Sequence, residues 1–155
     1  MSYYFFLGDT MLPVPPAKMT LTIKGKNKTI DLINEGEVNI IKTPGLSEIS
    51  FDARFPNQKY PFANYDTSLA DSLTSSLLGD SSFSFKGASY FLEAVESAKV
   101  SQIPLRFIVS RMTPDFMMHW DTTMLMTVED YKVNEDATEG FDAIVPLKLK
   151  EWRDY

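Results

Sequence analysis

Six acidic side chains are concentrated near the end of the sequence, and they are the residues best suited to acid–base chemistry. They are Glu129, Asp130, Glu135, Asp136, Glu139 and Asp142. Two carboxylates about 5–9.5 Å apart, one with a raised pKa, would suit glycoside hydrolysis. The spacing D-x-[DN]-x-[DN]-G of a calcium loop is absent from this run. Two interpretations without catalysis are a solvated turn between strands and electrostatic docking to a basic partner surface through Glu135, Asp136 and Glu139.

His119 is the only histidine of the chain. A single histidine cannot build a multi-histidine metal site, and no G-x-S-x-G turn is present to expose a serine nucleophile beside it. The sequence has no cysteine, which excludes disulfides, thiolate metal sites and a cysteine nucleophile. The glycines form no phosphate-binding motif. We therefore expect no catalytic residue, no metal site and no cofactor, and His119 to be structural or exposed.

The last residues mix cations with large aromatic side chains, as Lys148, Lys150, Trp152, Arg153 and Tyr155 show. Such a mixture suits a protein interface or single-stranded nucleic acid. The net charge of −6 opposes nucleic-acid binding, which needs a basic stripe to neutralise phosphates. We expect Trp152, Arg153 and Tyr155 to contact a protein partner. The alternative is a final strand whose Trp152 packs into the core.

Period-two alternation predicts the strands that carry these groups. Met124, Met126 and Val128 share one face of a strand before the acidic run. After the run, the strand that begins near Phe141 has an apolar face made of Ala143, Val145, Leu147 and Leu149. Alternation of this kind is typical of half-buried strands. The acidic run is therefore predicted to be the turn between two long strands.

The first half of the chain shows the same strand signals. The predicted strands cover Met19–Ile23, Thr29–Ile33, Glu37–Lys42 and Ser47–Ala53. The turn residues Gly25 to Lys28 predict a hairpin between the first two strands. Tyr3–Leu7 is either a first core strand or an arm that docks on a neighbouring subunit.

One helix and one serine-rich segment complete the predicted elements. Phe91, Ala94, Val95 and Ala98 share one face of a helix over Ala88–Lys99, and Pro104–Ser110 alternates as a strand. Residues 64–87 are predicted to be a peripheral insertion, either a mobile surface loop or a docking element. In the second case Leu69, Leu73 and Leu77, spaced four residues apart, would offer an apolar stripe to a partner. The predicted fold is mainly β (α+β) with one main helix.

Length and charge limit the possible classes of protein. A chain of 155 residues is expected to form a single domain over residues 1–155. No run approaches the roughly 20 apolar residues of a membrane helix. We expect neither nucleic acid nor membrane as a partner.

Three stretches resemble one known family in the same order. They are Leu12 to Phe62, Pro104 to Phe116, and the closing string MTVEDYKVNEDATEGFDAIVPLKLKEWRDY, which ends at Tyr155. They are similar to a baseplate or hub protein family of contractile phage tails, found in PBSX-like phages and diffocin-like R-type bacteriocins. Members usually continue into a LysM peptidoglycan-binding module, which this sequence does not contain. We therefore do not expect this chain to bind the cell wall directly.

The resemblance implies a strand-rich sandwich or split barrel like those of tail tube and baseplate proteins. It also implies a structural role without catalysis, in a particle assembled in the bacterial cytoplasm. Expected partners are hub, tube-proximal and wedge proteins, with six copies around the tail axis. Two alternatives from other classes remain open: a small cell-wall hydrolase that uses the carboxylates of residues 129–142, and a peptidoglycan-binding module.

Overall fold

The computed structural model describes residues 2–63, 86–115 and 117–154. Its strands are β1 (Ser2–Leu7), β2 (Thr10–Met11), β3 (Met19–Thr22), β4 (Lys28–Leu32), β5 (Gly36–Ile40), β6 (Glu48–Phe55), β7 (Leu105–Met112), β8 (Met118–Tyr131), β9 (Asn134–Glu135) and β10 (Ala143–Glu151). The helix is α2 (Ala88–Val100), and η1 (Ala137–Glu139) is a short 3₁₀ turn.

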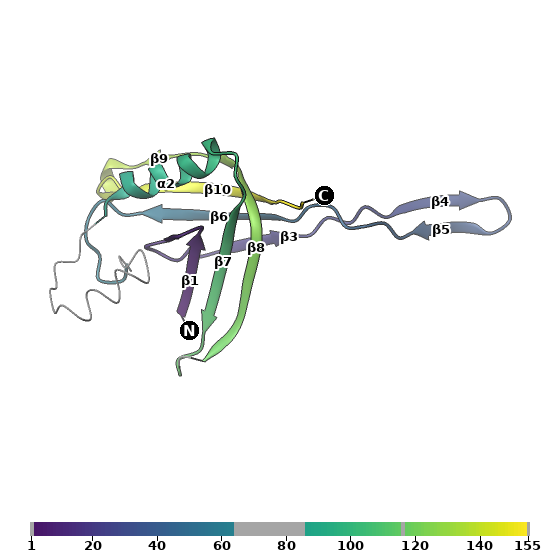
Figure 1. The fold of residues 1–155 in the computed structure, drawn as a ribbon, viewed down its shortest axis with the longest axis horizontal. Helices are drawn as coiled ribbons and strands as arrows, with labels where there is room; N and C mark the ends of the chain where they lie inside the picture. The colour runs from purple at the N-terminus through teal and green to yellow at the C-terminus, as the bar shows by residue number, and fades with distance from the viewer. Residues whose placement is uncertain (1, 64–85, 116, 155) are drawn as a thin grey trace.

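Most strands join one antiparallel sheet with the order β2-β1-β7-β8-β10-β6-β3, and β9 pairs with β10. β4 and β5 pair only with each other. β8 curves strongly (Figure 1), and it pairs with β7 through its first part and with β10 through its second part. The pairing of β8 with β10 shifts register between Lys148 and Leu149, and such irregularities accompany bends in strands.

The core lies on the concave side of this bent sheet. Phe51 of β6 and Phe107 of β7 stack with ring centroids 5.6 Å apart, although β8 and β10 separate their strands in the sheet. Phe5 of β1 reaches both rings, at 6.0 and 6.3 Å. Strands at a distance in the sheet therefore face each other across one hydrophobic core.

The alternation predicted near the C-terminus is confirmed. Ala143, Val145, Leu147 and Leu149 are buried, as are Met126 and Val128, while Met124 packs against the same core. Lys148, between two buried residues of β10, is exposed. Because successive side chains of a strand point to opposite faces, one register places Ala143, Val145, Leu147 and Leu149 inside, whereas Ile144 and Pro146 on the other face are half-buried.

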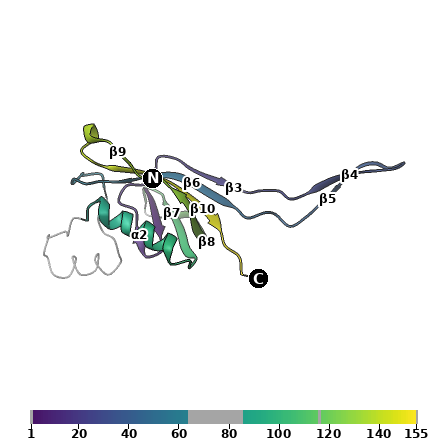
Figure 2. The same ribbon diagram turned by 90° about the horizontal axis from the view of Figure 1, so that it is seen from above.

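Helix α2 covers part of the core. Phe91 and Val95 are each 1% exposed, and the Phe91 ring stacks on Phe55 of β6 at 5.3 Å. The Asn57 side chain accepts a hydrogen bond from the Ala88 backbone N–H, 3.0 Å away. This bond satisfies one of the N–H groups that a helix start leaves without partners. Figure 2 shows α2 on one side of the sheet.

The predicted class, mainly β with one main helix, is confirmed. Tyr3–Leu7 belongs to a core strand, because β1 pairs with β7 and buries Phe5 and Leu7. The hairpin predicted between the first two strands after residue 18 is wrong. β3 pairs with β6, whereas β4 pairs with β5. The predicted insertion over residues 64–87 lies outside the described residues, apart from its last two.

Candidate functional site

A long two-stranded extension projects from the body of the molecule. We call residues 23–47 the arm; it contains β4 and β5 and stands away from the sheet in both ribbon views (Figures 1 and 2). At its base the Gly45 N–H donates to the Lys24 carbonyl at 2.7 Å. The Lys42 N–H then donates to the Asn27 side chain at 2.9 Å. These bonds hold the outgoing and returning segments of the arm together between the β3–β6 pair and the β4–β5 ribbon.

The turn at the end of the arm is set by local backbone chemistry. The Glu35 N–H donates to the Leu32 carbonyl at 3.2 Å. Asn34 and Gly36 have φ values of 76° and 78°, in the left-handed region that asparagine and glycine tolerate best. Asn34 and Gly36 therefore allow the chain to reverse direction at the tip of the arm.

One face of the arm is apolar and uncovered. The register pairs Ile30 with Val38 and Lys28 with Ile40. Leu32, Val38 and Ile40 are 38%, 37% and 40% exposed. An isolated two-stranded ribbon is marginally stable in water, and contiguous apolar surface of this kind marks interaction sites. The apolar face of the arm is therefore left without a covering element among the described residues.

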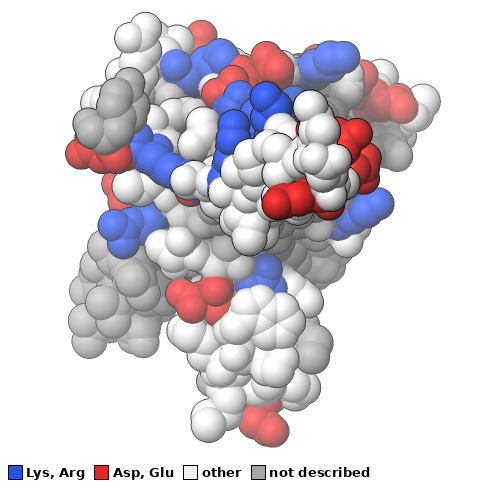
Figure 3. Space-filling model, turned by 90° about the vertical axis from the view of Figure 1, so that its right-hand side faces the viewer, with Lys and Arg blue, Asp and Glu red and all other residues white. Residues whose placement is uncertain are grey.

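The opposite face of the arm is acidic near its tip. Asp31 lies directly across from Glu37 in the ribbon, and like charges in that position are destabilising. Glu35 lies in the adjoining turn. Within the described part of the chain none of these three carboxylates forms an ion pair. Figure 3 faces the side to which the arm projects and shows acidic side chains on its foremost part.

The base of the arm is basic. A groove with a cavity volume of about 450 Å³ is bordered there by Lys24, Lys26, Glu48, Lys150 and Arg153, together with residues 44–46. Lys24 is paired with Glu48 at 2.7 Å. Cations thus outnumber carboxylates around the groove, and the two ends of the arm carry opposite charge.

The C-terminal tail fastens the base of the arm to the body. The Glu151 N–H donates to the Ser47 carbonyl, and the Ser47 N–H donates to the Glu151 carboxylate, both at 2.8 Å. Arg153 donates to Glu151 and to the carbonyls of Pro44 and Gly45. The Arg153 guanidinium and the Ser47 N–H outweigh partial burial and lower the pKa of Glu151 to about 2.

Of the predicted tail residues that the structure describes, Arg153 lies where the arm leaves the body. Arg153 contacts the arm directly. Trp152 is 38% exposed, and its backbone N–H donates to the Leu125 carbonyl at 2.9 Å. Of the two expectations for Trp152, core packing is wrong. Tyr155, Leu69, Leu73 and Leu77 lie outside the described residues.

The acidic run does not form one surface. Glu135 and Asp136 are exposed at β9 and η1, at the end of the body away from the arm (Figure 1). Asp136 accepts hydrogen bonds from the Thr138 hydroxyl and N–H, which lower its pKa. Glu139 ends η1. These residues occupy a turn region separate from the arm and the tail.

Asp142 behaves differently from its acidic neighbours because its side chain is fully buried. Its carboxylate accepts from Arg54 at 3.0 Å, from the Asn57 N–H at 2.9 Å and from the Tyr60 hydroxyl at 2.8 Å. Burial acts to raise its pKa, but these donors prevail and the pKa is lowered. Asp142 therefore links the start of β10 to the end of β6. The prediction that it belongs to a solvated turn is wrong.

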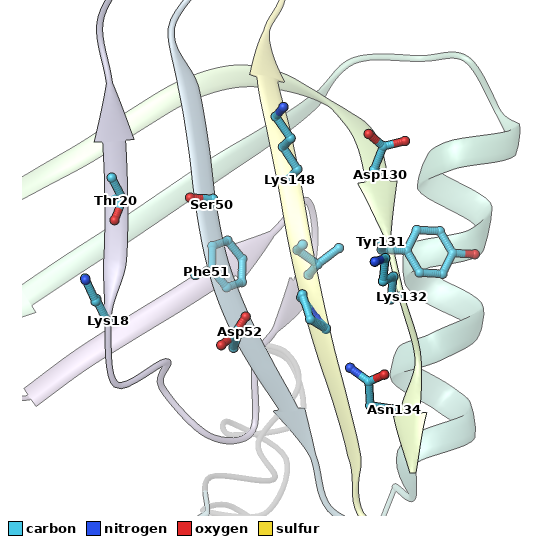
Figure 4. A pocket seen from close by; sticks show the side chains of 12 residues that line it. Lys18, Thr20, Ser50, Phe51, Asp52, Asp130, Tyr131, Lys132, Asn134 and Lys148 are labelled. Carbon is cyan, nitrogen blue, oxygen red and sulfur yellow. The ribbon is translucent and has the colours of Figure 1, made fainter.

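Two other regions of the described chain carry polar side chains. His119 is exposed on β8, where its ring lies 4.5 Å from the Trp120 ring. An open groove of about 650 Å³ lies on the outer face of β3, β6, β10 and β8. Figure 4 shows its side chains spread along separate strands, with Lys18, Lys132 and Lys148 interspersed with Asp52 and Asp130. Charges of both signs alternate across it.

The sequence predicts the two strands of the arm but does not distinguish them from the strands of the main sheet. Ile30, Leu32, Val38 and Ile40 show the alternation of a half-buried strand. What distinguishes the segment is composition, because residues 7–50 contain no aromatic residue. The core, in contrast, is built around Phe5, Phe51, Phe55, Phe91 and Phe107.

The chain is similar to one curated protein of Bacillus subtilis (strain 168), the uncharacterized protein YqbP. The two are 22% identical over 142 residues, which cover 92% of this chain and 53% of YqbP. The chain thus spans about half the length of the relative that it matches. No protein-family model matches it.

A membrane-spanning helix and a cluster of metal ligands are both absent from the described residues. No helix among them has the length and apolarity needed to cross a membrane. The same residues contain no group of three or more His, Cys, Asp or Glu side chains placed to hold a metal ion.

Proposed function

We propose that this protein is a structural component of the baseplate or hub of a contractile phage tail or of a phage-tail-like bacteriocin. In this role it links hub, tube-proximal and wedge proteins in a particle assembled in the bacterial cytoplasm. The resemblance of its three sequence stretches to that baseplate family motivates the particle. The arm is the observation that carries the structural role.

The argument from the arm is energetic. β4 and β5 make extensive contacts only with each other, so their apolar face gains no burial from the body. A ribbon of this kind is stabilised when a partner covers it, because burial of apolar surface is the main favourable term in association. Exposed strands are also a liability that proteins usually shield. A role in assembly accounts for retaining such an element.

The surroundings of the buried Asp142 carboxylate favour the structural role over the hydrolase alternative. A hydrolase acid needs a raised pKa, whereas the donors around Asp142 lower its pKa. Asp142 is also enclosed by Arg54, Asn57 and Tyr60. Its position serves the connection between β6 and β10.

The test is incorporation into particles. The chain is expressed with the tail genes of its host in two forms, one native and one with residues 28–40 replaced by a short Gly-Ser turn. The native chain should sediment with purified tails, and the shortened chain should remain in the soluble fraction. Glu93→Lys on the exposed surface of α2 is the control variant and should incorporate normally. Absence of the native chain from the particles would reject the proposal.

A turbidity assay on purified cell walls addresses the hydrolase alternative. We expect no clearing by the purified protein. Clearing that disappears in a Glu129→Gln variant would replace the structural proposal with an enzymatic one.

A further inference from the structure

The arm carries two surfaces that complement each other but cannot meet within one molecule. Its tip bears Asp31, Glu35 and Glu37, and its base is bordered by Lys24, Lys26, Lys150 and Arg153. About 3.3 Å of rise per strand residue separates Lys26 from Asp31 by roughly 17 Å along the ribbon. The paired strands keep the tip away from the base of its own arm. A second copy of the chain can supply the missing half.

Charge is the first match between the two surfaces. Asp31 and Glu37 lie opposite each other, and neither forms an ion pair with a described residue. Lys26 and Lys150 form no ion pair in the same part of the chain. Bringing the acidic pair to these lysines would relieve the repulsion across the ribbon. Such complementarity sets the register and specificity of an interface.

Apolar surface is the second match. The arm presents Leu32, Val38 and Ile40 on one face. Near the groove, Ile23 is 67% exposed and Ile41 is 84% exposed, and Leu46 borders the groove itself. A docked arm would therefore bury apolar side chains on both partners while its carboxylates meet lysines.

We propose that the arm of one copy docks its acidic tip in the basic groove at the base of the arm of a neighbouring copy. The contact joins different surfaces of the two copies, so it is heterologous and can be repeated around a ring. The inference rests on the proposed function, because it names the partner of the same arm.

The absence of cysteine from the chain makes site-specific cross-linking the direct test. Glu37→Cys marks the tip and Lys26→Cys marks the groove. A mixture of the two full-length variants, treated with a short bismaleimide at low salt, should give a dimer that neither variant gives alone. The control mixture pairs Lys26→Cys with Glu96→Cys on the exposed surface of α2 and should remain monomeric. Cross-linking of Glu37→Cys to itself would overturn the proposal in favour of a symmetric tip-to-tip contact.

Charge reversal gives a second test of the same contact. In the Glu37→Cys background, the added changes Asp31→Lys and Glu35→Lys should reduce cross-linking to Lys26→Cys in the groove by about tenfold or more, since close interface charge pairs couple this strongly. Adding Lys150→Glu to the groove variant should restore part of the lost cross-linking. Equal cross-linking in all charge variants would overturn the proposal.

The outcome in assembled particles separates this inference from the proposed function. Particles that contain the chain but show no tip-to-groove cross-link would reject the inference and leave the function intact. A chain that cross-links in solution but is absent from particles would reject the function and leave the inference intact.

Discussion

Leu147 and Lys148 are adjacent residues of β10 whose side chains lie on opposite faces of the sheet. Leu147 is 2% exposed, so Leu147→Asp places an unpaired carboxylate in the core and should lower the free energy of unfolding by about 4 kcal/mol or more. Lys148 is exposed across from Asp130, and Lys148→Asp should cost at most about 1 kcal/mol through like-charge repulsion. Urea unfolding measures both. Equal tolerance of the two changes would contradict the register.

Glu151 makes stability depend on pH in a defined window. Its pKa is lowered from an ordinary value near 4.5 to about 2 in the folded state. Between these values the unfolded chain binds more protons, so stability rises with pH. The contribution is fully present above pH 4.5 and is lost as pH falls through about 2. Glu151→Gln should flatten the pH dependence of the urea midpoint in this window. Glu96→Gln serves as the exposed control, and an unchanged slope in Glu151→Gln would contradict the assignment.

Asp142 and Glu135 test whether the acidic run is a fold element or a surface. Asp142→Ala would leave the Asn57 N–H without its acceptor and Arg54 without its buried partner, at a cost of about 3 kcal/mol. Glu135→Ala should leave the melting temperature nearly unchanged and should lower the yield of particles if this turn docks on a basic partner. Thermal unfolding and particle counts are the measurements. A large loss of stability in Glu135→Ala with normal particle yield would show that the turn belongs to the fold.

At the scale of single elements, the sequence predicted strands well and their pairing less well. Alternation located β10 because Val145, Leu147 and Leu149 face one core. It could not assign the partner of β3, because the turn signal at Gly25 is local whereas the bonds between β3 and β6 join residues about 30 positions apart. The burial of Asp142 depends on Arg54, 88 positions away. Neither of these long-range contacts produces a local pattern in the sequence.

The arm should be the least protected paired element of the isolated protein. Amides of β4 and β5 are protected only by a two-stranded ribbon, whereas β6 lies between β3 and β10 over the core. Native-state hydrogen exchange should therefore be about 100-fold or more faster in β4 and β5 than in β6, because local opening there disrupts no core packing. Docking should slow exchange in the arm and leave β6 unchanged. Equal protection of the arm and β6 in the isolated protein would indicate that the body covers the arm.

At the scale of the whole molecule, the extended arm is separate from the sheet that contains the hydrophobic core. The sheet buries its aromatic residues around Phe51 and Phe107, and this core does not involve the arm. The arm can therefore be covered or exposed without a change in the core, because none of its residues belongs to the core cluster. A free chain with such a small docking element is expected to associate weakly, because small interfaces belong to transient contacts.

The proposed tip-to-groove contact bears on the copy number expected in the proposed particle. A tip-to-groove contact is heterologous, and repetition closes a ring when the rotation between neighbours divides a full turn. The resemblance to a tail baseplate family leads us to expect closure at six copies around the tail axis. Sedimentation of the purified chain should show monomers or weak association. An averaged map of the particle should show six copies, each arm reaching the base of the next; one or three copies would reject this arrangement, as would an arm seated on a different protein.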